Sequence, residues 1–439
     1  MKSVRPVAPP AVRWITRTLE EAGFETWTVG GAVRDALLGH PSGDWDLATR
    51  ATPRAVRRIF RRTVPIGVEH GTVGVLARDG TMYEVTTFRR DVQTDGRHAV
   101  VAFADTIEED LARRDFTVNA VAWHALREVF CDPYGGAADL EAGVLRTVGI
   151  AEDRFREDYL RILRALRFAG RFELRIEETT WQAACRLVGH LPVLSAERIR
   201  EELIKVLGQD ARPTRALELY ADSGALAVLY PELEGLRPKG AWLPTLAVIE
   251  RLPAYRSDLR LAALLRPLSR AQAAAVLLRL RLSNALTDET ATIAAASTLP
   301  RPDAADVEFR RWLRRHGSER LGRIARVELA EARAAGHAGA RGAEGRTGSS
   351  AADVVASWRR CRSVRRADPP LQVGDLRFGG ADLKRLGLRP GPLFGRVLDG
   401  LLDWVLEDPR RNEPVSLEER AHELASELSG TDSSGGDGP

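Results

Sequence analysis

Alternating apolar and polar positions mark the first third of the chain as a region of short strands and helices. Residues Glu25–Val29 are rich in strand formers and end at a glycine pair. Residues Ala32–Leu38 follow a helical pattern, and Gly39 fits its C-terminal stop. A second strand is predicted over Asp44–Ala48, after a turn that contains Pro, Ser and Gly. This order of strands and helices predicts an α/β unit.

From Ala151 onward the pattern becomes helical and remains so. Phe155–Arg171 and Ala196–Leu207 carry apolar residues three and four positions apart, which predicts amphipathic helices. The stretch 334–350 is rich in Gly, Ala and Ser, which is typical of a linker or a long loop. Residues 429–439 are rich in Gly, Ser and Asp, so we expect them to be disordered.

The glycine pair and the residues after it form a pattern that indicates chemistry on a nucleoside triphosphate. Gly30 and Gly31 allow a positive φ and the close approach of a phosphate. The N–H groups at the start of the predicted helix favour an anion, and Arg34 adds a charge-assisted donor. Asp44 and Asp46 share one face of the predicted strand, where two carboxylates can bind Mg²⁺. Each pattern alone is also typical of a plain turn and a solvated acid pair, and only their order favours the phosphate site.

A third acidic residue is predicted on a later strand. Alternation over residues 82–89 puts Glu84 and Thr86 on one face, with Tyr83 and Val85 on the other. A glutamate beside the Asp pair can complete a metal shell or help to deprotonate an attacking hydroxyl. Spacing alone leaves an exposed strand glutamate equally open.

Asp158 and Arg161 are three residues apart in a predicted helix, which would place them on one face. Arg164 and Arg167 are predicted to continue the same stripe. A carboxylate can accept from an exocyclic amine while a guanidinium donates to the neighbouring ring nitrogen, a pattern that cytosine and adenine share. Guanine and uracil would leave both groups unpaired. The same spacing is also typical of a surface ion pair, so the residues alone leave both interpretations open.

Length and composition limit the class of protein to which the chain can belong. At 439 residues the chain exceeds one ordinary domain. Of the 65 basic residues 61 are arginines, against 61 acidic residues and a net charge of +4. A GC-rich genome explains most of that total, so only arginines in motifs are used as evidence for RNA or nucleotide binding. Three cysteines without paired or metal-like spacing predict reduced thiols in the cytoplasm, and no apolar run predicts a signal peptide or a membrane span.

The motifs in this order resemble those of the class II tRNA CCA-adding enzymes and bacterial poly(A) polymerases, which are nucleotidyltransferases of the polymerase-β superfamily. The family signature, Gly-Gly-x-Val-Arg-Asp-x-Leu-Leu-Gly followed by Asp-x-Asp, matches residues 30–39 and 44–46. Residues 110–120 are similar to the second motif of the family, and residues 157–169 to its neck-helix motif. The likeness is strong from about Val29 to Leu233.

The resemblance implies an α/β head, with a polymerase-β-like sheet and helices, followed by an all-α neck, body and tail in an elongated, curved arrangement. With the composition it gives these boundaries: head 1–148, neck with a base-recognition helix 149–211, helical body 212–333, linker or loop 334–350, helical tRNA-binding tail 351–428, and disordered end 429–439. Within the tail, the compact part is expected from about Leu371 to Leu428.

The resemblance also assigns roles to residues. It implies catalysis by Asp44, Asp46 and Glu84, with two Mg²⁺ ions held by Asp44 and Asp46. The nucleotide-binding residues that it implies are Gly30, Gly31, Arg34, Arg114, Asp115, Asp158, Arg161, Arg164 and Arg167. The expected substrates are CTP, ATP and tRNA that lacks all or part of its 3′ CCA end, in the cytoplasm, without a membrane or a stable protein partner.

Several features bear on which member of the family this is. Residues 195–203 look like the CCA-adding form and lack the Pro-x-Arg-Leu segment of bacterial poly(A) polymerases. Residues 379–392 resemble tails that grip the tRNA elbow, although a packing corner between helices is equally open. Residues 91–103 are polar, and family members that add the terminal adenosine carry a flexible loop there; Ala99 stands where proline is usual. The alternatives are a poly(A) polymerase, a CC-only or A-only enzyme, a transferase for a protein or small molecule, and a non-catalytic RNA-binding protein.

Overall fold

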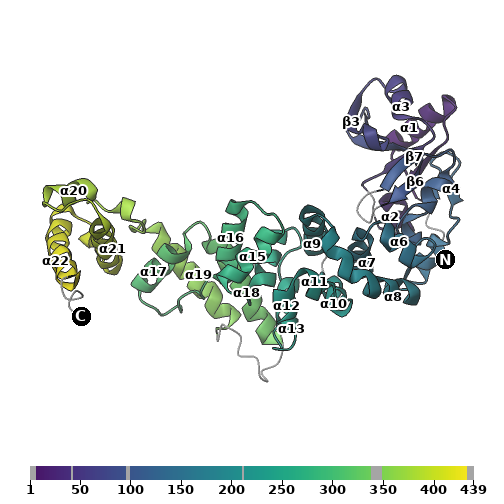
Figure 1. Cartoon of the computed structure of the whole chain (residues 1–439). Coiled ribbons are helices and arrows are strands. Elements are labelled where there is room, and N and C mark those ends of the chain that lie inside the picture. Colours follow the sequence, from purple (N-terminus) through teal and green to yellow (C-terminus); the bar gives the residue numbers. More distant parts are fainter. Residues whose placement is uncertain (1–5, 41–42, 95–98, 210–211, 338–348, 433–439) are drawn as a thin grey trace, which may run out of the picture. The chain divides into compact units, whose positions relative to one another are not determined.

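The computed structural model describes residues 6–40, 43–94, 99–209, 212–337 and 349–432 (Figure 1). Contacts along the chain divide it into two compact units, which are Met1–Lys239 with Arg279–Arg281, and Gly240–Leu278 with Leu282–Pro439. The division after Lys239 lies inside the stretch 212–333 that the sequence assigned to one helical body. Within the described ranges, no helix is both long enough and apolar enough to cross a membrane.

The first unit is built around a mixed sheet that has seven strands among the described residues, in the order β3-β4-β5-β2-β1-β8-β9. Strand β2 runs parallel to β5, and the other neighbours are antiparallel. The strands are β1 (Thr26–Val29), β2 (Asp46–Thr49), β3 (Thr63–Gly67), β4 (Thr72–Leu76), β5 (Met82–Thr87), β8 (Ala122–Trp123) and β9 (Phe130–Cys131). The predicted strand over Asp44–Ala48 therefore begins two residues later, at Asp46.

Successive side chains of the sheet enter two different cores, because strand residues alternate between faces. Leu47 packs on one face with residues of α1 (Pro10–Glu21) and α3 (Pro53–Ile59). Ala48 packs on the other face with Phe88 and with Leu111 of α4 (Ile107–Ala112). Helices thus cover the centre of the sheet on both sides, and the face that carries Ala48 also carries Asp46.

The remaining elements of the first unit lie between the strands of the sheet or after them in the sequence. Its other helices are α2 (Gly31–Leu37), α5 (Gly136–Glu141), α6 (Ala151–Glu157), α7 (Leu160–Arg171), α8 (Glu178–Leu187), α9 (Ala196–Gln209), α10 (Thr214–Asp222), α11 (Ala225–Leu229) and α12 (Pro231–Glu234). Short 3-10 helices lie at Val68–His70, Thr117–Asn119 and Val188–Val193, and β10 (Val144–Leu145) pairs with β11 (Arg175–Ile176). Helix α7 packs against α9 and α10.

The predicted loop over residues 91–103 is mostly a β-hairpin. Strand β6 (Arg89–Thr94) pairs antiparallel with β7 (Ala99–Phe103). The polar centre of the expected loop, residues 95–98, lies outside the described residues. The loop prediction was wrong for the flanks, because the apolar, strand-forming residues Ala99–Phe103 pair with the more polar β6 across the hairpin.

The described part of the second unit is helical. Its elements are α13 (Trp242–Glu250), α14 (Ser257–Leu265), α15 (Arg270–Arg279, whose last residue belongs to the first unit), α16 (Asn284–Ala295), α17 (Asp306–His316), α18 (Leu321–His337), α19 (Ala351–Arg366), α20 (Gly380–Arg385), α21 (Pro392–Glu407) and α22 (Pro414–Asp432), with 3-10 turns at Val373–Asp375 and Pro409–Arg411.

Three observations refine the boundaries expected for the helical remainder. Helix α18 continues to His337, into the expected linker, and α22 continues to Asp432, into the segment expected to be disordered. Helix α19 packs on α17 and α18. Helices α20, α21 and α22 share a hydrophobic core of their own, with partly buried residues from Leu371 to Leu428 packed against it.

Candidate functional site

One cavity of about 550 Å³ in the first unit gathers most of the predicted site residues. Its wall is formed by Val29, Gly30, Gly31, Arg34, Asp46, Leu47, Ala48, Thr72, Glu84, Thr86, Arg89, Asp110, Arg113, Arg114, Asp115, Asn119, Asp158, Leu160, Arg161, Arg164, Phe168 and Arg198. Asp44 and Arg167 are the two predicted site residues that this described wall does not include. The cavity therefore joins the end of β1, the exposed face of β5 and the start of α7.

Gly30 follows β1 directly, in a backbone conformation that favours glycine, and lies beside two functional side chains. Its φ is +76°, which L side chains rarely adopt. A Cβ at this position would lie 3.4 Å from Nη1 of Arg114 and 3.6 Å from Oδ2 of Asp46. The predicted strand–glycine–helix order is present, with α2 beginning at Gly31.

Arg34 borders the cavity but is held by neighbouring protein groups. Its Nε and Nη2 donate to Oδ1 of Asp35 at 2.9 and 2.7 Å, and its Nη1 donates to Oδ1 of Asn119 at 2.7 Å. The guanidinium also lies over the ring of Phe172, 4.4 Å from its centroid. Arg34 is therefore a fixed part of the wall, and burial lowers its pKa while Asp35 opposes that shift.

The pKa of Asp46 depends on the charges of two neighbouring carboxylates. Burial, and then the charges of Asp44 and Glu84, raise the pKa of Asp46 to about 6, although Arg114 acts in the opposite direction. Glu84 lies on the cavity face of β5, as alternation predicted, while Tyr83 and Val85 are buried in the core. Asp44 is exposed and lies two residues before Asp46, just ahead of β2, and its charge is among those that raise the pKa of Asp46.

This acidic group fits a divalent cation that arrives with phosphates. Among the described residues, no three His, Cys, Asp or Glu side chains form a ready metal-binding group. Mg²⁺ commonly takes only one or two carboxylates and fills its other positions with phosphate oxygens and water. A cation would oppose the burial and the neighbouring negative charges that together raise the pKa of Asp46.

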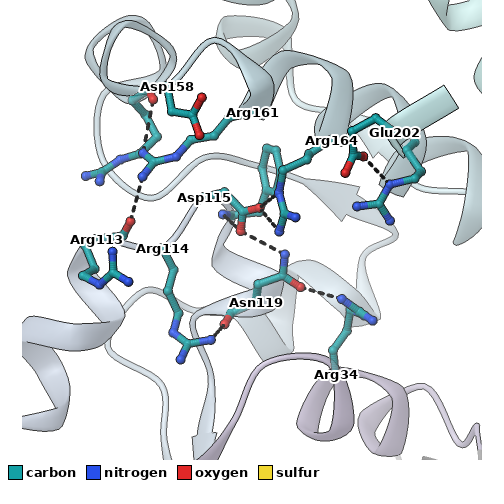
Figure 2. Close-up of polar contacts among 12 residues, drawn as sticks. Arg34, Arg113, Arg114, Asp115, Asn119, Asp158, Arg161, Arg164 and Glu202 are labelled. Carbon is teal, nitrogen blue, oxygen red and sulfur yellow. Dashed lines mark hydrogen bonds and ion pairs between the residues drawn. The ribbon is translucent and has the colours of Figure 1, made fainter. Parts of the chain in front are cut away.

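A network of polar side chains forms part of the cavity wall (Figure 2). Arg164 donates from Nε to Oδ2 of Asp115 at 2.7 Å, and Nδ2 of Asn119 donates to Oδ1 of Asp115 at 3.0 Å. Burial alone would raise the pKa of Asp115, but Arg164 and these hydrogen bonds lower it to about 2. Asn119, on the 3-10 turn Thr117–Asn119, connects Asp115 to Arg34. Sequence reasoning identified the two arginines and Asp115 but missed Asn119.

Arg114 is held between α4 and the turn that follows it. Its Nη2 donates to Oδ2 of Asp110 at 3.1 Å, and its Nη1 donates to the carbonyl oxygen of Asn119 at 3.2 Å. Asp110 is buried and also accepts from the backbone N–H of Arg89. These bonds fix the guanidinium beside Gly30, where it faces Asp46.

The expected single helix over Phe155–Arg171 is wrong, because the chain breaks at Asp158. Helix α6 ends at Glu157, Asp158 has an extended backbone (φ −157°, ψ 105°), and α7 begins at Leu160. Oδ1 of Asp158 accepts from the N–H of Leu160 at 3.1 Å, which caps the new helix. Asp158 and Arg161 therefore border one cavity without sharing a helix face.

Each of these two side chains has its own partner. Oδ2 of Asp158 accepts from Nη2 of Arg198 at 2.7 Å. Arg161 donates from Nη1 to Oε2 of Glu157 at 2.6 Å and from Nη2 to the carbonyl oxygen of Arg113 at 3.1 Å (Figure 2). Sequence reasoning missed Arg198, whose position in α9 offered no local signal beyond the resemblance of residues 195–203.

Arg167 does not belong to the described wall of the cavity. Its Nε donates to Oε2 of Glu202 at 2.6 Å, and the two side chains are only 5% and 1% exposed. This departs from the expected stripe, because a three-residue step turns a helix by about 300°, so Arg167 lies roughly 120° around α7 from Arg161.

Comparisons with known proteins identify the family of the chain. Residues 26–146 match the family model of the poly A polymerase head domain, and residues 173–236 match that of a probable RNA- and SrmB-binding site of polymerase A. The CCA-adding enzyme of Geobacillus kaustophilus is 40% identical over 294 residues, which cover 66% of this chain and 70% of that protein.

Solved structures extend the likeness to most of the chain. The Bacillus stearothermophilus CCA-adding enzyme in complex with CTP is 31% identical with a TM-score of 0.71, covering 97% of this chain and all of that one. The Thermotoga maritima CCA-adding enzyme complexed with tRNA_CCA is 23% identical with a TM-score of 0.53, covers 95% of this chain and 97% of that one, and shows the same fold. The head sheet, the helical remainder and the sequence identity together show that this chain belongs to the family of CCA-adding enzymes.

Proposed function

We propose that the chain is a template-independent tRNA nucleotidyltransferase. It adds C, C and A from CTP and ATP to tRNA that lacks all or part of its 3′ CCA end, and pyrophosphate leaves. The observation that carries this proposal is one cavity bordered by Asp46 and Glu84 of the sheet and by Asp158 and Arg161 at the α6–α7 break. The relatives named as CCA-adding enzymes, one of them solved with CTP, support it.

In the reaction, the 3′ hydroxyl of the tRNA attacks the α-phosphorus, a new P–O bond forms, and the bond to the pyrophosphate breaks. Asp44 and Asp46 would hold two Mg²⁺ ions, which when bound activate the hydroxyl and stabilise charge on the phosphate oxygens. Glu84 faces the same space and would complete this acidic group or accept the hydroxyl proton. The position of Asp46 supports this arrangement, since burial and then the charges of Asp44 and Glu84 raise its pKa to about 6, and a bound cation would favour its charged form.

The remaining wall residues would bind and orient the nucleotide. Gly30 and Gly31 would admit the triphosphate, with Arg114 as a fixed cationic donor beside them. Arg34 would act as a cationic wall that also holds Asn119. Asp115 would lie near the ribose, with Arg164 as its fixed partner. We assign Arg167 to the support of α7 rather than to the nucleotide, because Glu202 holds it.

The base would be selected by Asp158 and Arg161. The carboxylate accepts from the exocyclic amine of cytosine or adenine, and the guanidinium donates to the adjacent ring nitrogen. Uracil and guanine would present a carbonyl to the carboxylate and an N–H to the guanidinium, which leaves both protein groups unpaired. The fixed partners of both side chains support this role, because a rigid pair discriminates better than a mobile one.

We propose the functional regions as expected from the sequence, with a catalytic head 1–148, a selecting neck 149–211, a helical body 212–333 and a tRNA-binding tail from 351. The separate core of α20, α21 and α22 supports a distinct role for the end of the tail. A cytoplasmic location follows from tRNA as substrate, and the three free cysteines agree with it.

The proposal is tested by incubating the protein with three tRNAs, which end before CCA, after C and after CC, each with a single labelled nucleotide. We expect CMP on the first two, AMP on the third, and neither UMP nor GMP. Repeated AMP addition to any RNA end would indicate a poly(A) polymerase instead, and failure of one step would indicate a CC-only or A-only enzyme.

A further inference from the structure

The face of the sheet that carries Glu84 continues beyond the cavity as an apolar surface. Residues directly opposite one another in neighbouring strands share a face, and the register places Val64, Gly74 and Glu84 in one row across β3, β4 and β5. On the opposite face, Val73, Val75 and Val85 are buried in the core. The row therefore runs from the proposed catalytic carboxylate to the edge strand β3.

Three apolar side chains lie exposed on this row and beside it. Val64 and Ile66 of β3 are each 42% exposed, and Met82 of β5 is 47% exposed. Ile66 and Met82 meet above Gly74, because a Cβ there would come within 2.7 Å of Cδ1 of Ile66 and 2.8 Å of Sδ of Met82. We call Val64, Ile66 and Met82 the apolar platform, and the glycine lets it lie close to the sheet.

The platform is continuous with the cavity. Thr72, Glu84 and Thr86 line the cavity from β4 and β5, on the same face as Gly74 and Met82. Met82 is two residues from Glu84 along β5, which is about 7 Å. An RNA whose terminal 3′ hydroxyl lies at Glu84 would therefore have its last nucleotide within reach of the apolar platform.

The surroundings of the platform suit an RNA strand. Arg61 and Arg62 precede β3 directly and are exposed. The carbonyl oxygen of Arg62 accepts from the N–H of Leu76 at 3.0 Å, and Leu76 is paired with Met82, so Arg62 lies on the strand row of the platform. Cationic side chains beside an apolar surface are what a single-stranded nucleic acid requires, since phosphates meet the charges and bases meet the apolar atoms.

We propose that the apolar platform is the binding site for the last base of the acceptor RNA, the nucleotide whose 3′ hydroxyl attacks. This inference rests on the proposed function and names a subsite for its second substrate. The enzyme must accept three different RNA ends in turn, so the contact must tolerate any base. Dispersion contact with a thioether and a branched aliphatic chain meets that need, because every base has an apolar face while hydrogen-bonding edges differ.

The test uses the full chain with Ile66→Asp or Met82→Asp, which place a charge on the platform. Val129→Asp is the matched control, since Val129 is 46% exposed and lies beside β9, at the other edge of the sheet. The measurements are single-turnover CMP addition at varied tRNA concentration, CTP binding by equilibrium dialysis, and thermal melting. We expect the platform variants to raise the KM for tRNA roughly tenfold, the order of one lost stacked base. CTP binding and the control variant should stay within about twofold of wild type.

Met82→Leu keeps the apolar surface and should restore the KM for tRNA. As a measurement that needs no variant, tRNA ending in a photoreactive 4-thiouracil nucleotide should crosslink wild-type protein within residues 63–82. Crosslinks elsewhere, or an unchanged KM in folded platform variants, would overturn the inference. A dimer that the platform variants dissociate, with tRNA kinetics unaltered, would show that a second copy of the chain occupies the platform. Wild-type protein that adds no CMP to any tRNA would instead refute the proposed function.

Discussion

Replacement of Arg167 by methionine separates a structural role from a nucleotide-binding one. The Arg167–Glu202 pair has a separation of 2.6 Å, with side chains 5% and 1% exposed. Removal of one partner from a buried pair costs about 3–5 kcal/mol, because the other charge stays buried without compensation. Lys205, 3.1 Å from Glu202 but 41% exposed, offsets part of that cost, so we expect a loss of about 3 kcal/mol for Arg167→Met.

Two measurements test this prediction. Urea unfolding of the full chain is monitored by tryptophan fluorescence, and CTP binding is measured under conditions where the variant is folded. The double variant Arg167→Met with Glu202→Leu removes both charges and should recover most of the lost stability. CTP affinity of the folded single variant should remain within about twofold of wild type. An unchanged unfolding midpoint combined with a large loss of CTP affinity would refute this reasoning and return Arg167 to the nucleotide site.

Three further predictions follow from other parts of the molecule. Burial raises the pKa of Glu328 from 4.5 to about 7, against the opposing effects of the Leu299 N–H and Arg266, so folding favours the protonated form. The free energy of unfolding of the wild type should therefore fall as pH rises through this range. Glu328→Gln should reduce the difference between the urea midpoints at pH 5 and pH 8, and an unaltered difference would contradict the assignment. Asp44→Ala and Asp46→Ala should each abolish CMP and AMP addition while tRNA binding by gel shift persists; near-normal rates at saturating Mg²⁺ would exclude the carboxylates as metal ligands. Truncation before Leu371 removes the separate core of α20 to α22 and should raise the KM for tRNA more than that for CTP, whereas unchanged tRNA affinity in a folded truncation would remove the tail from tRNA binding.

Local chemistry made much of the head predictable. Gly30 has a positive φ between β1 and α2. The strand formers before the glycine pair and the helical pattern after it predicted this turn. Alternation predicted that Glu84 and Val85 lie on opposite faces of β5, and the structure places Val85 in the core and Glu84 at the cavity. Such features depend on residues close in the sequence, so the sequence is sufficient to predict them.

Features that depend on contacts with residues far away in the sequence could not be predicted from local patterns. The apolar spacing of residues 155–171 continues through Asp158, and the break there coincides with a cap on Leu160 and an ion pair to Arg198, which is 40 residues away. Spacing by three also suggested one stripe for Arg161, Arg164 and Arg167, although such a stripe winds around the helix. Glu202, which pairs with Arg167, lies 35 residues further along the chain.

The central claim is that Asp158 and Arg161 select cytosine and adenine without a nucleic-acid template. The most direct measurement is a competition among all four nucleoside triphosphates, with wild type, Asp158→Ala and Arg161→Ala acting on tRNA that lacks CCA and on tRNA that ends in CC. We predict that Arg161→Ala weakens CTP and ATP use alike, by roughly ten- to a hundred-and-fifty-fold for one lost charge-assisted hydrogen bond. Asp158→Ala should also admit UTP or GTP to a detectable extent. Wild-type rates and selectivity in both variants would contradict the account, because the two residues would then be only ion pairs in the wall of the cavity.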